Sequence, residues 1–207
     1  MTRIIGGRFG GRLVRAPKGS ATRPTSDRVR ESLFSRLDAW DAIEGLAVLD
    51  VYAGSGALGL EAASRGAARV DLVEADAKAA AVIRGNVTAL GLSALGLGGG
   101  GPAAGGTQVQ VHACTVRAFA GRLSPAGADL VLGDPPYPLG EEDLAGDLAA
   151  LAAGGWIAPD ALLVIERSSR SPEPAWPAGI EGVDEKKYGE TRLWFARAGS
   201  GADKFGP

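Results

Sequence analysis

The chain has 207 residues, which fits one α/β domain, and hydrophobic residues make up 45% of it, enough to form a substantial core. Cys114 is the only cysteine, which excludes an intramolecular disulfide, and His112 is the only histidine, which argues against His-based triads and metal sites. The sequence has no apolar run suited to a membrane span and no segment typical of a secretory signal, so we expect a cytoplasmic protein.

Positive charge is concentrated in the N-terminal part of the chain. Residues 1–37 carry nine lysines and arginines against two acidic residues, so this segment is +7 although the formal net charge is −2. This asymmetry indicates an anionic partner, and a short hairpin would hold its cations in an array suited to a phosphate backbone. A solvated arm that only aids solubility is the alternative. The cations expected to bind are Arg3, Arg8, Arg12, Arg15, Lys18 and Arg23.

The hydrophobic pattern predicts two short strands in residues 1–15, a loop over 16–24 and a helix over about 26–38. From residue 46, buried strand runs alternate with helical segments, which predicts a mostly parallel sheet covered on both faces. We expect strands over 46–51, 69–74, 109–113, 128–133 and 161–166, and helices over 58–64, 76–90 and about 141–152. The pattern over 182–187 and 191–196 predicts two further strands and a tight turn, with the last strand antiparallel.

The same pattern divides the chain into regions. Residues 1–24 are expected to form a basic hairpin or arm, and residues 25–198 the main domain. Residues 93–106 are glycine-rich and of low complexity, which predicts a flexible surface insertion. We expect residues 199–207 to be a disordered tail.

A glycine-rich segment, Asp50-Val-Tyr-Ala-Gly-Ser-Gly-Ala-Leu-Gly59, follows the first strand of the alternating region. Its glycines allow a tight turn and a close approach to a ligand, and Glu74 at the end of the next strand suits the ribose hydroxyls of an adenosine-type cofactor. These features fit both NAD and S-adenosylmethionine. Asp50 favours S-adenosylmethionine, because a carboxylate here would repel a pyrophosphate but attract a sulfonium and an ammonium.

We expect the cofactor to contact this segment and the end of the third strand of the alternating region, where an adenine ring would lie. The expected cofactor-binding residues are Asp50, Tyr52, Ala53, Gly54, Ser55, Gly56, Glu74, Cys114 and Thr115. A packed thiol is an equal alternative for Cys114. No metal ligand set is expected.

A second motif, Asp134-Pro-Pro-Tyr137, ends the 128–133 strand and is the most specific signal in the chain. Pro135 and Pro136 fix φ and withhold two N–H donors, so the Asp134 carboxylate and the Pro135 carbonyl can both face one amino group. Tyr137 offers a stacking face for a flat base. These four residues are the expected catalytic corner, and alignment and electrostatics would supply most of the rate without a His base.

The sequence resembles the bacterial 16S rRNA guanine-N2 methyltransferases of the RsmD family over nearly its whole length. Besides the two motifs above, the resemblance is carried by Arg3-Ile-Ile-Gly-Gly, by Thr22-Arg-Pro-Thr-Ser-Asp-Arg-Val-Arg-Glu-Ser-Leu-Phe34 and by Tyr188-Gly-Glu-Thr-Arg-Leu193. It implies a Rossmann-like class I methyltransferase with a seven-stranded sheet, a monomer, and methylation of a guanine N2 in small-subunit rRNA, within a partly assembled particle. The basic hairpin would bind rRNA. One departure is Cys114, where the family often carries Asp or Asn.

Three other functions are compatible with parts of the pattern. An adenine-N6 methyltransferase acting on DNA would share the two motifs, although the chain has no room for a separate DNA-recognition domain. An NAD-dependent oxidoreductase is disfavoured by Asp50 and by the Asp134–Tyr137 corner. A non-catalytic RNA-binding module is disfavoured because both motifs are intact.

Overall fold

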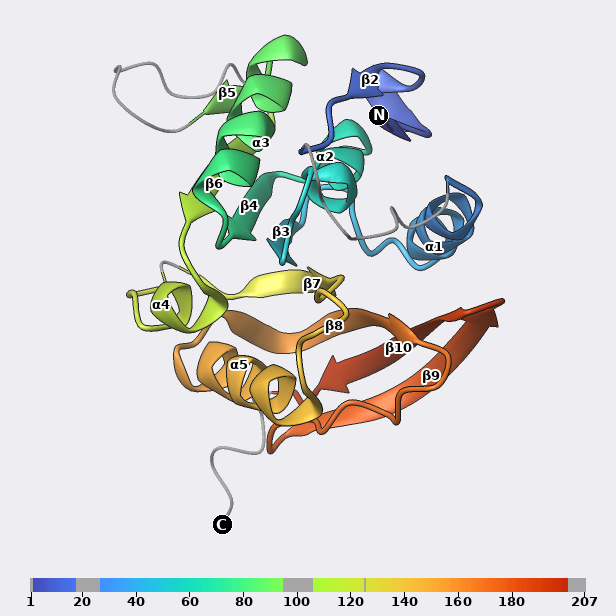
Figure 1. Cartoon of the computed structure of the whole chain (residues 1–207), viewed down its shortest axis with the longest axis vertical. Helices are drawn as coiled ribbons and strands as arrows, with labels where there is room; N and C mark the ends of the chain where they lie inside the picture. The colour runs from blue at the N-terminus through green and yellow to red at the C-terminus, as the bar shows by residue number, and fades with distance from the viewer. Residues whose placement is uncertain (1, 18–26, 95–105, 125, 201–207) are drawn as a thin grey trace.

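The structure, a computed structural model, describes residues 2–17, 27–94, 106–124 and 126–200, and its elements are arranged around one central sheet (Figure 1). The strands are β1 (Thr2–Arg3), β2 (Leu13–Val14), β3 (Ala47–Val51), β4 (Arg69–Glu74), β5 (Ser93–Ala94), β6 (Gln108–Ala113), β7 (Ala128–Gly133), β8 (Ile157–Ser168), β9 (Ile180–Tyr188) and β10 (Thr191–Ala198). The helices are η1 (Gly7–Phe9, a 3-10 turn), α1 (Asp27–Ala39), α2 (Ala57–Ser64), α3 (Ala77–Ala89), α4 (Val116–Ala120) and α5 (Glu141–Ala153). None of these helices is long and apolar enough to cross a membrane.

The central sheet has the strand order β5-β6-β4-β3-β7-β8-β10-β9. Strands β6, β4, β3, β7 and β8 pair in parallel, and β10 pairs antiparallel with both β8 and β9. The expected seven strands are therefore confirmed, including the antiparallel last strand. The eighth strand, β5, is a two-residue edge strand that pairs with β6. The other residues of the expected 93–106 insertion, apart from Gly106, lie outside the described residues.

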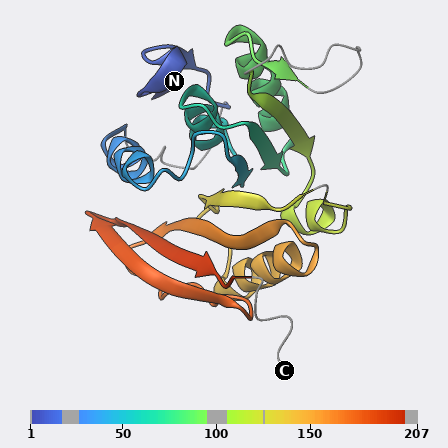
Figure 2. The same cartoon turned by 180° about the vertical axis from the view of Figure 1, so that it is seen from behind.

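Side chains on successive strand residues enter two separate hydrophobic clusters, because a strand directs them alternately to opposite faces. Val48 packs with α1, α2 and α3 on one face, whereas Leu49 packs with α4 and α5 on the other. Leu130 and Val131 divide in the same way. Both faces are thus covered, as expected from the apolar strand runs, and helices are visible on both sides of the sheet (Figures 1 and 2).

The N-terminal hairpin pairs Thr2 with Val14, which confirms its expected form, and it packs beside α2 (Figures 1 and 2). Glu61 of α2 is fully buried, and its two carboxylate oxygens accept hydrogen bonds from the N–H groups of Ile5 and Gly6, at 2.6 and 2.9 Å. Gly7 has a φ of +73°, and a Cβ there would overlap the Ser64 carbonyl. The hairpin is therefore built into the main domain rather than projecting from it as a free arm.

The expected helices all form, with ends that differ by one or two residues, and α4 is an addition. Its five residues were too few to produce a helical period in the sequence. Thr115 caps this helix, because its hydroxyl accepts from the Ala118 N–H at 3.2 Å. The expected loop over 16–24 and the tail over 199–207 lie mainly outside the described residues.

Candidate active site

The two sequence motifs lie side by side at the carboxyl edge of the sheet. Val51, the last residue of β3, is in register with Gly133, the last residue of β7, and the two strands are parallel neighbours. The glycine-rich segment and the Asp134 corner therefore leave the sheet from adjacent positions. Ligands of open α/β sheets bind in this region, outside the carboxyl ends of the strands.

The glycine-rich loop requires its glycines for two different reasons. Gly54 and Gly56 have φ values of +58° and +78°, which lie in the left-handed region where a side chain is disfavoured. Gly59 is needed for space, because a Cβ there would lie 2.8 Å from Leu72 Cδ2 and 3.0 Å from the Asp50 carboxylate. The loop ends where α2 begins at Ala57, and Gly59, in the first turn of α2, allows that helix to pack closely against β3 and β4.

Asp50 is fully buried beneath this loop, and its Oδ2 accepts a hydrogen bond from the Gly59 N–H at 2.8 Å. Burial raises the pKa of this carboxyl to about 7; the Gly59 hydrogen bond opposes the shift and the nearby Glu74 adds to it. A cation beside Asp50 would favour its ionised form. The site therefore fits a ligand with a positive charge, as S-adenosylmethionine has.

Glu74 ends β4, the strand next to β3, and its carboxylate faces the glycine-rich loop. It accepts from the Gly54 N–H at 2.8 Å and from the Asp76 N–H at 2.8 Å. Glu74 is in register with Ala113, so Cys114 is the next residue beyond the end of β6. The structure thus brings Asp50, Glu74 and Cys114 to the ends of three adjacent strands, as the cofactor prediction requires.

Other expected cofactor residues have contacts within the protein. The Thr115 hydroxyl caps α4, and the Cys114 sulfur lies 3.4 Å from Arg122 Nη2. Tyr52 has a φ of +62°, and its hydroxyl donates to Asp147 of α5 at 2.7 Å. The Ala53 N–H donates to the Val73 carbonyl, and the Ser55 carbonyl accepts from Asn86 Nδ2 at 3.1 Å. These contacts hold the loop against β4, α3 and α5.

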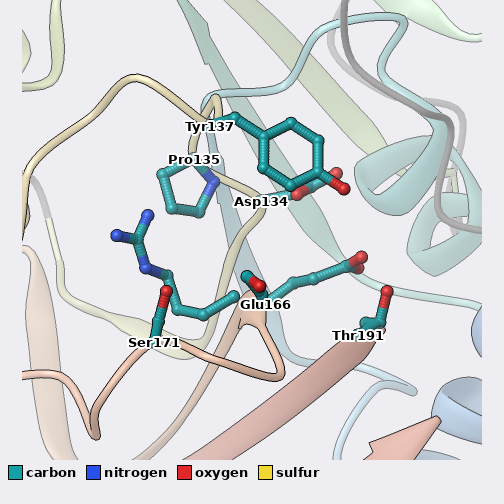
Figure 3. Close-up of a pocket in the computed structure, with 8 residues that line it drawn as sticks. Asp134, Pro135, Tyr137, Glu166, Ser171 and Thr191 are labelled. Atoms are coloured by element: carbon teal, nitrogen blue, oxygen red, sulfur yellow. The ribbon is translucent and has the colours of Figure 1, made fainter. Parts of the chain in front are cut away.

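The Asp134–Tyr137 corner opens onto a pocket that is partly open to solvent. Pro135 is buried, whereas the Tyr137 side chain is 63% exposed at the rim. The carboxylates of Asp134 and Glu166 and the hydroxyls of Tyr137 and Thr191 are directed to the same side of the pocket (Figure 3). These oxygen atoms offer hydrogen-bond acceptors to a polar ligand.

Five of the residues that line this pocket were not among the expected site residues: Glu166, Arg167, Ser168, Ser171 and Thr191. Glu166 lies near the carboxyl end of β8, and Thr191 begins β10 just after a turn at Gly189, whose φ is +61°. One signal for Glu166 was available, since it closes the expected 161–166 strand as Glu74 closes 69–74. No such signal was available for Thr191, because it reaches this edge only through the antiparallel pairing of β10 with β8.

Two family segments identified by resemblance meet beside this pocket. The hydroxyls of Ser32 in α1 and Tyr188 in β9 lie 2.6 Å apart, and Arg36 of α1 forms an ion pair with Asp184 of β9. These contacts join α1 to the β9–β10 hairpin. The final segment therefore has a structural role in addition to placing Thr191.

The described hairpin cations Arg8, Arg12 and Arg15 are exposed, as binding to phosphate would require. Arg3 is also exposed but lies 3.6 Å from Asp27, and Lys18 and Arg23 are outside the described residues. Within the described ranges, no group of three or more His, Cys, Asp and Glu residues could hold a metal ion. His112 is buried, with its Nε2 2.8 Å from Asp71, and therefore has a packing role.

The sheet order, the glycine-rich loop over a buried carboxylate and the Asp-Pro-Pro-Tyr corner define the class: this is the Rossmann-like fold of class I methyltransferases. The fold resembles the magnesium protoporphyrin IX methyltransferase of Synechocystis PCC 6803, solved with bound S-adenosylmethionine, with a TM-score of 0.58 and 16% identity over 83% of this chain and 78% of that one. At that identity, the likeness extends to the fold alone.

Comparison of the chain with more similar proteins identifies its family. The family model described as Conserved hypothetical protein 95 matches residues 2–197, so the chain belongs to this family, that of the RsmD methyltransferases. The chain is 35% identical to ribosomal RNA small subunit methyltransferase D of Escherichia coli K12, over 91% of this chain and 85% of that protein. It also resembles the solved structure of the Escherichia coli protein yhhF, with a TM-score of 0.73 and 33% identity over 96% and 98% of the two chains. The family expectation is confirmed.

Proposed function

We propose that this enzyme transfers a methyl group from S-adenosylmethionine to the exocyclic N2 of a guanine in small-subunit ribosomal RNA. The single observation that carries the proposal is the register of Val51 with Gly133, which places the cofactor loop and the Asp134 corner side by side. The E. coli relative, named as a small-subunit rRNA methyltransferase, supports the RNA substrate.

The residues at the strand ends suit S-adenosylmethionine. Asp50 would favour its positive charges, Glu74 would accept from its ribose hydroxyls, and the loop around Gly54 and Gly56 would pack against it. When bound, the cofactor supplies a methyl group already activated by a neutral leaving group. Tyr52, Ala53 and Ser55 would contribute through the loop backbone, and Cys114 and Thr115 would border the adenine.

The corner would then activate the amine. Its nitrogen is a poor nucleophile because the lone pair is delocalised into the ring. The Asp134 carboxylate and the Pro135 carbonyl would accept its two hydrogens, while Tyr137 stacks on the base, and the lone pair would be aligned with the methyl group. After transfer, the nitrogen is cationic and loses a proton readily, so the residues that hold it need not include a strong base.

The hairpin cations Arg3, Arg8, Arg12 and Arg15, with Lys18 and Arg23, would bind the RNA backbone. The described hairpin is fixed to α2 through Glu61, so its cations would meet the RNA in a set geometry. We further propose that the enzyme acts as a cytoplasmic monomer on a small-subunit particle. The DNA adenine-N6 alternative gains no support from the relatives.

Methyl transfer from labelled S-adenosylmethionine to small-subunit particles, naked rRNA and duplex DNA tests the proposal. Nuclease digestion of the RNA product should yield N2-methylguanosine, with particles the preferred substrate. Recovery of N6-methyladenine, or labelling of DNA in preference to RNA, would contradict the substrate assignment.

A further inference from the structure

We infer that Glu166 selects guanine, by accepting the hydrogen on its N1 while Asp134 holds the neighbouring 2-amino group. This inference rests on the proposed function and adds a specificity-determining residue to it. The juxtaposition that carries it is the presence of two carboxylates, from the ends of adjacent strands, in one pocket beside an aromatic ring.

The register of β7 and β8 fixes the spacing of the two carboxylates. Gly133, the last residue of β7, is paired with Ile165 of the parallel strand β8, about 4.8 Å away, so Asp134 is the first residue beyond β7 and Glu166 is the next residue of β8. Leu132 and Val164, two residues earlier, pack in the same hydrophobic cluster, so alternation would direct Asp134 and Glu166 to the same face. Asp134 and Glu166 can therefore meet adjacent donors on a single base edge.

The face on which Glu166 lies is the cofactor face. Ile165 packs with α4 and α5, and Val164 packs with α1 to α3, so alternation directs Glu166 to the α1–α3 side. Asp50 lies on that side as well, since it bonds to Gly59 of α2. Glu166 is paired with Leu193 of β10. Thr191 lies two residues before Leu193 and therefore on the same face of the sheet. The pocket wall formed by Glu166 and Thr191 therefore faces the side on which the methyl donor would bind.

The hydrogen-bonding groups of the bases decide which one such a pocket accepts. Guanine presents two donors side by side, N1–H and the 2-amino group, whereas adenine and cytosine present a ring-nitrogen acceptor beside their amino group. A carboxylate that faces this ring position bonds to guanine but repels the lone pair of adenine N1 or cytosine N3. Asp134 binds an amino group in all three cases, so the second carboxylate is what separates them.

Asp134 and Glu166 are both half-buried, so a base that leaves one of these carboxylates facing a lone pair should be disfavoured, although less than in a fully enclosed site. The base analogue 2-aminopurine tests this directly, because it keeps the 2-amino group but has a bare acceptor at N1. We expect the wild-type enzyme to prefer guanine over 2-aminopurine by on the order of 100-fold or more in kcat/KM.

The experiment places guanosine or 2-aminopurine riboside at the mapped target nucleotide of small-subunit particles and compares wild type with Glu166→Gln. The glutamine amide can donate to N1 of 2-aminopurine, so the preference for guanine should fall at least about tenfold. Glu181→Gln, an exposed change on β9, is the matched control and should retain the wild-type preference. The ratio of the two substrates is insensitive to a loss of active protein.

Several results would overturn the inference. If Glu166→Gln slows both substrates equally, its role is structural only. If the wild type accepts 2-aminopurine as readily as guanine, the N1 hydrogen is not read, and that comparison needs no variant. A wild type that methylates guanine but fails these tests leaves the proposed function intact, whereas a wild type that produces no N2-methylguanosine contradicts both.

Discussion

The Tyr52 hydroxyl donates a 2.7 Å hydrogen bond to Asp147, and this bond ties the cofactor loop to α5. Tyr52 has a φ of +62°, a conformation that costs a non-glycine residue about 1 kcal/mol or more. Asp147 is itself held by Arg117 of α4, with Nε and Oδ1 3.0 Å apart. Burial raises the pKa of the Tyr52 hydroxyl, and the bond to Asp147 raises it further, so the hydroxyl remains a donor. We therefore propose that Tyr52 and Asp147 act as positioning residues.

Loss of this bond should weaken cofactor binding more than it slows turnover. For Tyr52→Phe, we expect the KM for S-adenosylmethionine to rise about fivefold, equivalent to about 1 kcal/mol, while kcat changes less than about twofold. Asp147→Ala should produce a similar rise in the KM for S-adenosylmethionine. Asp147→Asn should remain near wild type, because its amide can accept from Arg117 and donate to the Tyr52 oxygen. An unchanged KM in Tyr52→Phe would refute the positioning role.

The buried carboxyl of Asp50 should make the stability of the ligand-free protein depend on pH. Its pKa is about 7 in the folded state against 3.8 when exposed, so between these values the folded state binds more protons than the unfolded state. Stability from this group is therefore present below about pH 4 and is lost as the pH rises through about 7.

Relative to Asp50→Asn, the wild type should lose up to about 1.4 kcal/mol of unfolding free energy per pH unit between about pH 5 and 7. Asparagine keeps the acceptor for the Gly59 N–H but does not titrate, which makes it the matched comparison. Urea unfolding at several pH values measures the difference. Parallel stability curves for the two proteins would show that Asp50 ionises normally in the fold.

Much of the architecture was predictable because it follows from local pattern. Apolar strand runs such as 128–133 identify strands buried on both faces, and their alternation with helices requires a parallel sheet. The hairpin's close attachment was not predictable, since it depends on Glu61 meeting Ile5 and Gly6, some 55 residues away. The local hydrophobic pattern of the sequence gives no indication of such a contact.

Gly59 should tolerate no side chain, because of space alone. Gly59→Ala would push a methyl group against Leu72 and the Asp50 carboxylate, and we expect it to lower the unfolding free energy by about 1–3 kcal/mol and to weaken cofactor binding. Gly85 provides the matched control, since it lies in α3 with open space around its Cβ position. Gly85→Ala should instead stabilise the protein by about 0.5–1 kcal/mol. Thermal unfolding and calorimetric binding test both, and equal effects would contradict the packing explanation.

The hairpin cations should contribute to RNA affinity in proportion to the phosphates they neutralise. Replacement of Arg8, Arg12 and Arg15 by glutamine should weaken binding at low salt at least about tenfold and reduce the slope of log K against log salt by about 2. Arg197→Gln is the control, because Arg197 is exposed on β10 near the opposite end from Thr191. A salt slope that is identical in the triple variant and the wild type would exclude these cations from the interface.

The candidate site was predictable where one segment supplies all the atoms and less so where several meet. Asp134 to Tyr137 and Asp50 to Gly56 are contiguous motifs, and parallel strand ends meet at one edge, so their proximity followed from topology. Thr191 reaches the pocket only through the antiparallel β10, and Tyr188 contacts Ser32 across 156 residues. Such contacts depend on how the strands are aligned with one another, and the sequence pattern does not specify this alignment.

The central claim is that the Asp134 corner performs the chemistry. It is tested most directly by measuring, in Asp134→Ala, the rate of methyl transfer and the affinity for the cofactor separately. Asp143→Ala, an exposed change in the first turn of α5, is the matched control and should retain wild-type turnover. We expect Asp134→Ala to lose on the order of 10³-fold in the single-turnover rate of methyl transfer to small-subunit RNA, with the Kd for S-adenosylmethionine within about threefold of wild type. An Asp134→Ala enzyme that transfers methyl groups at the wild-type rate would contradict the assignment of this corner as the catalytic centre.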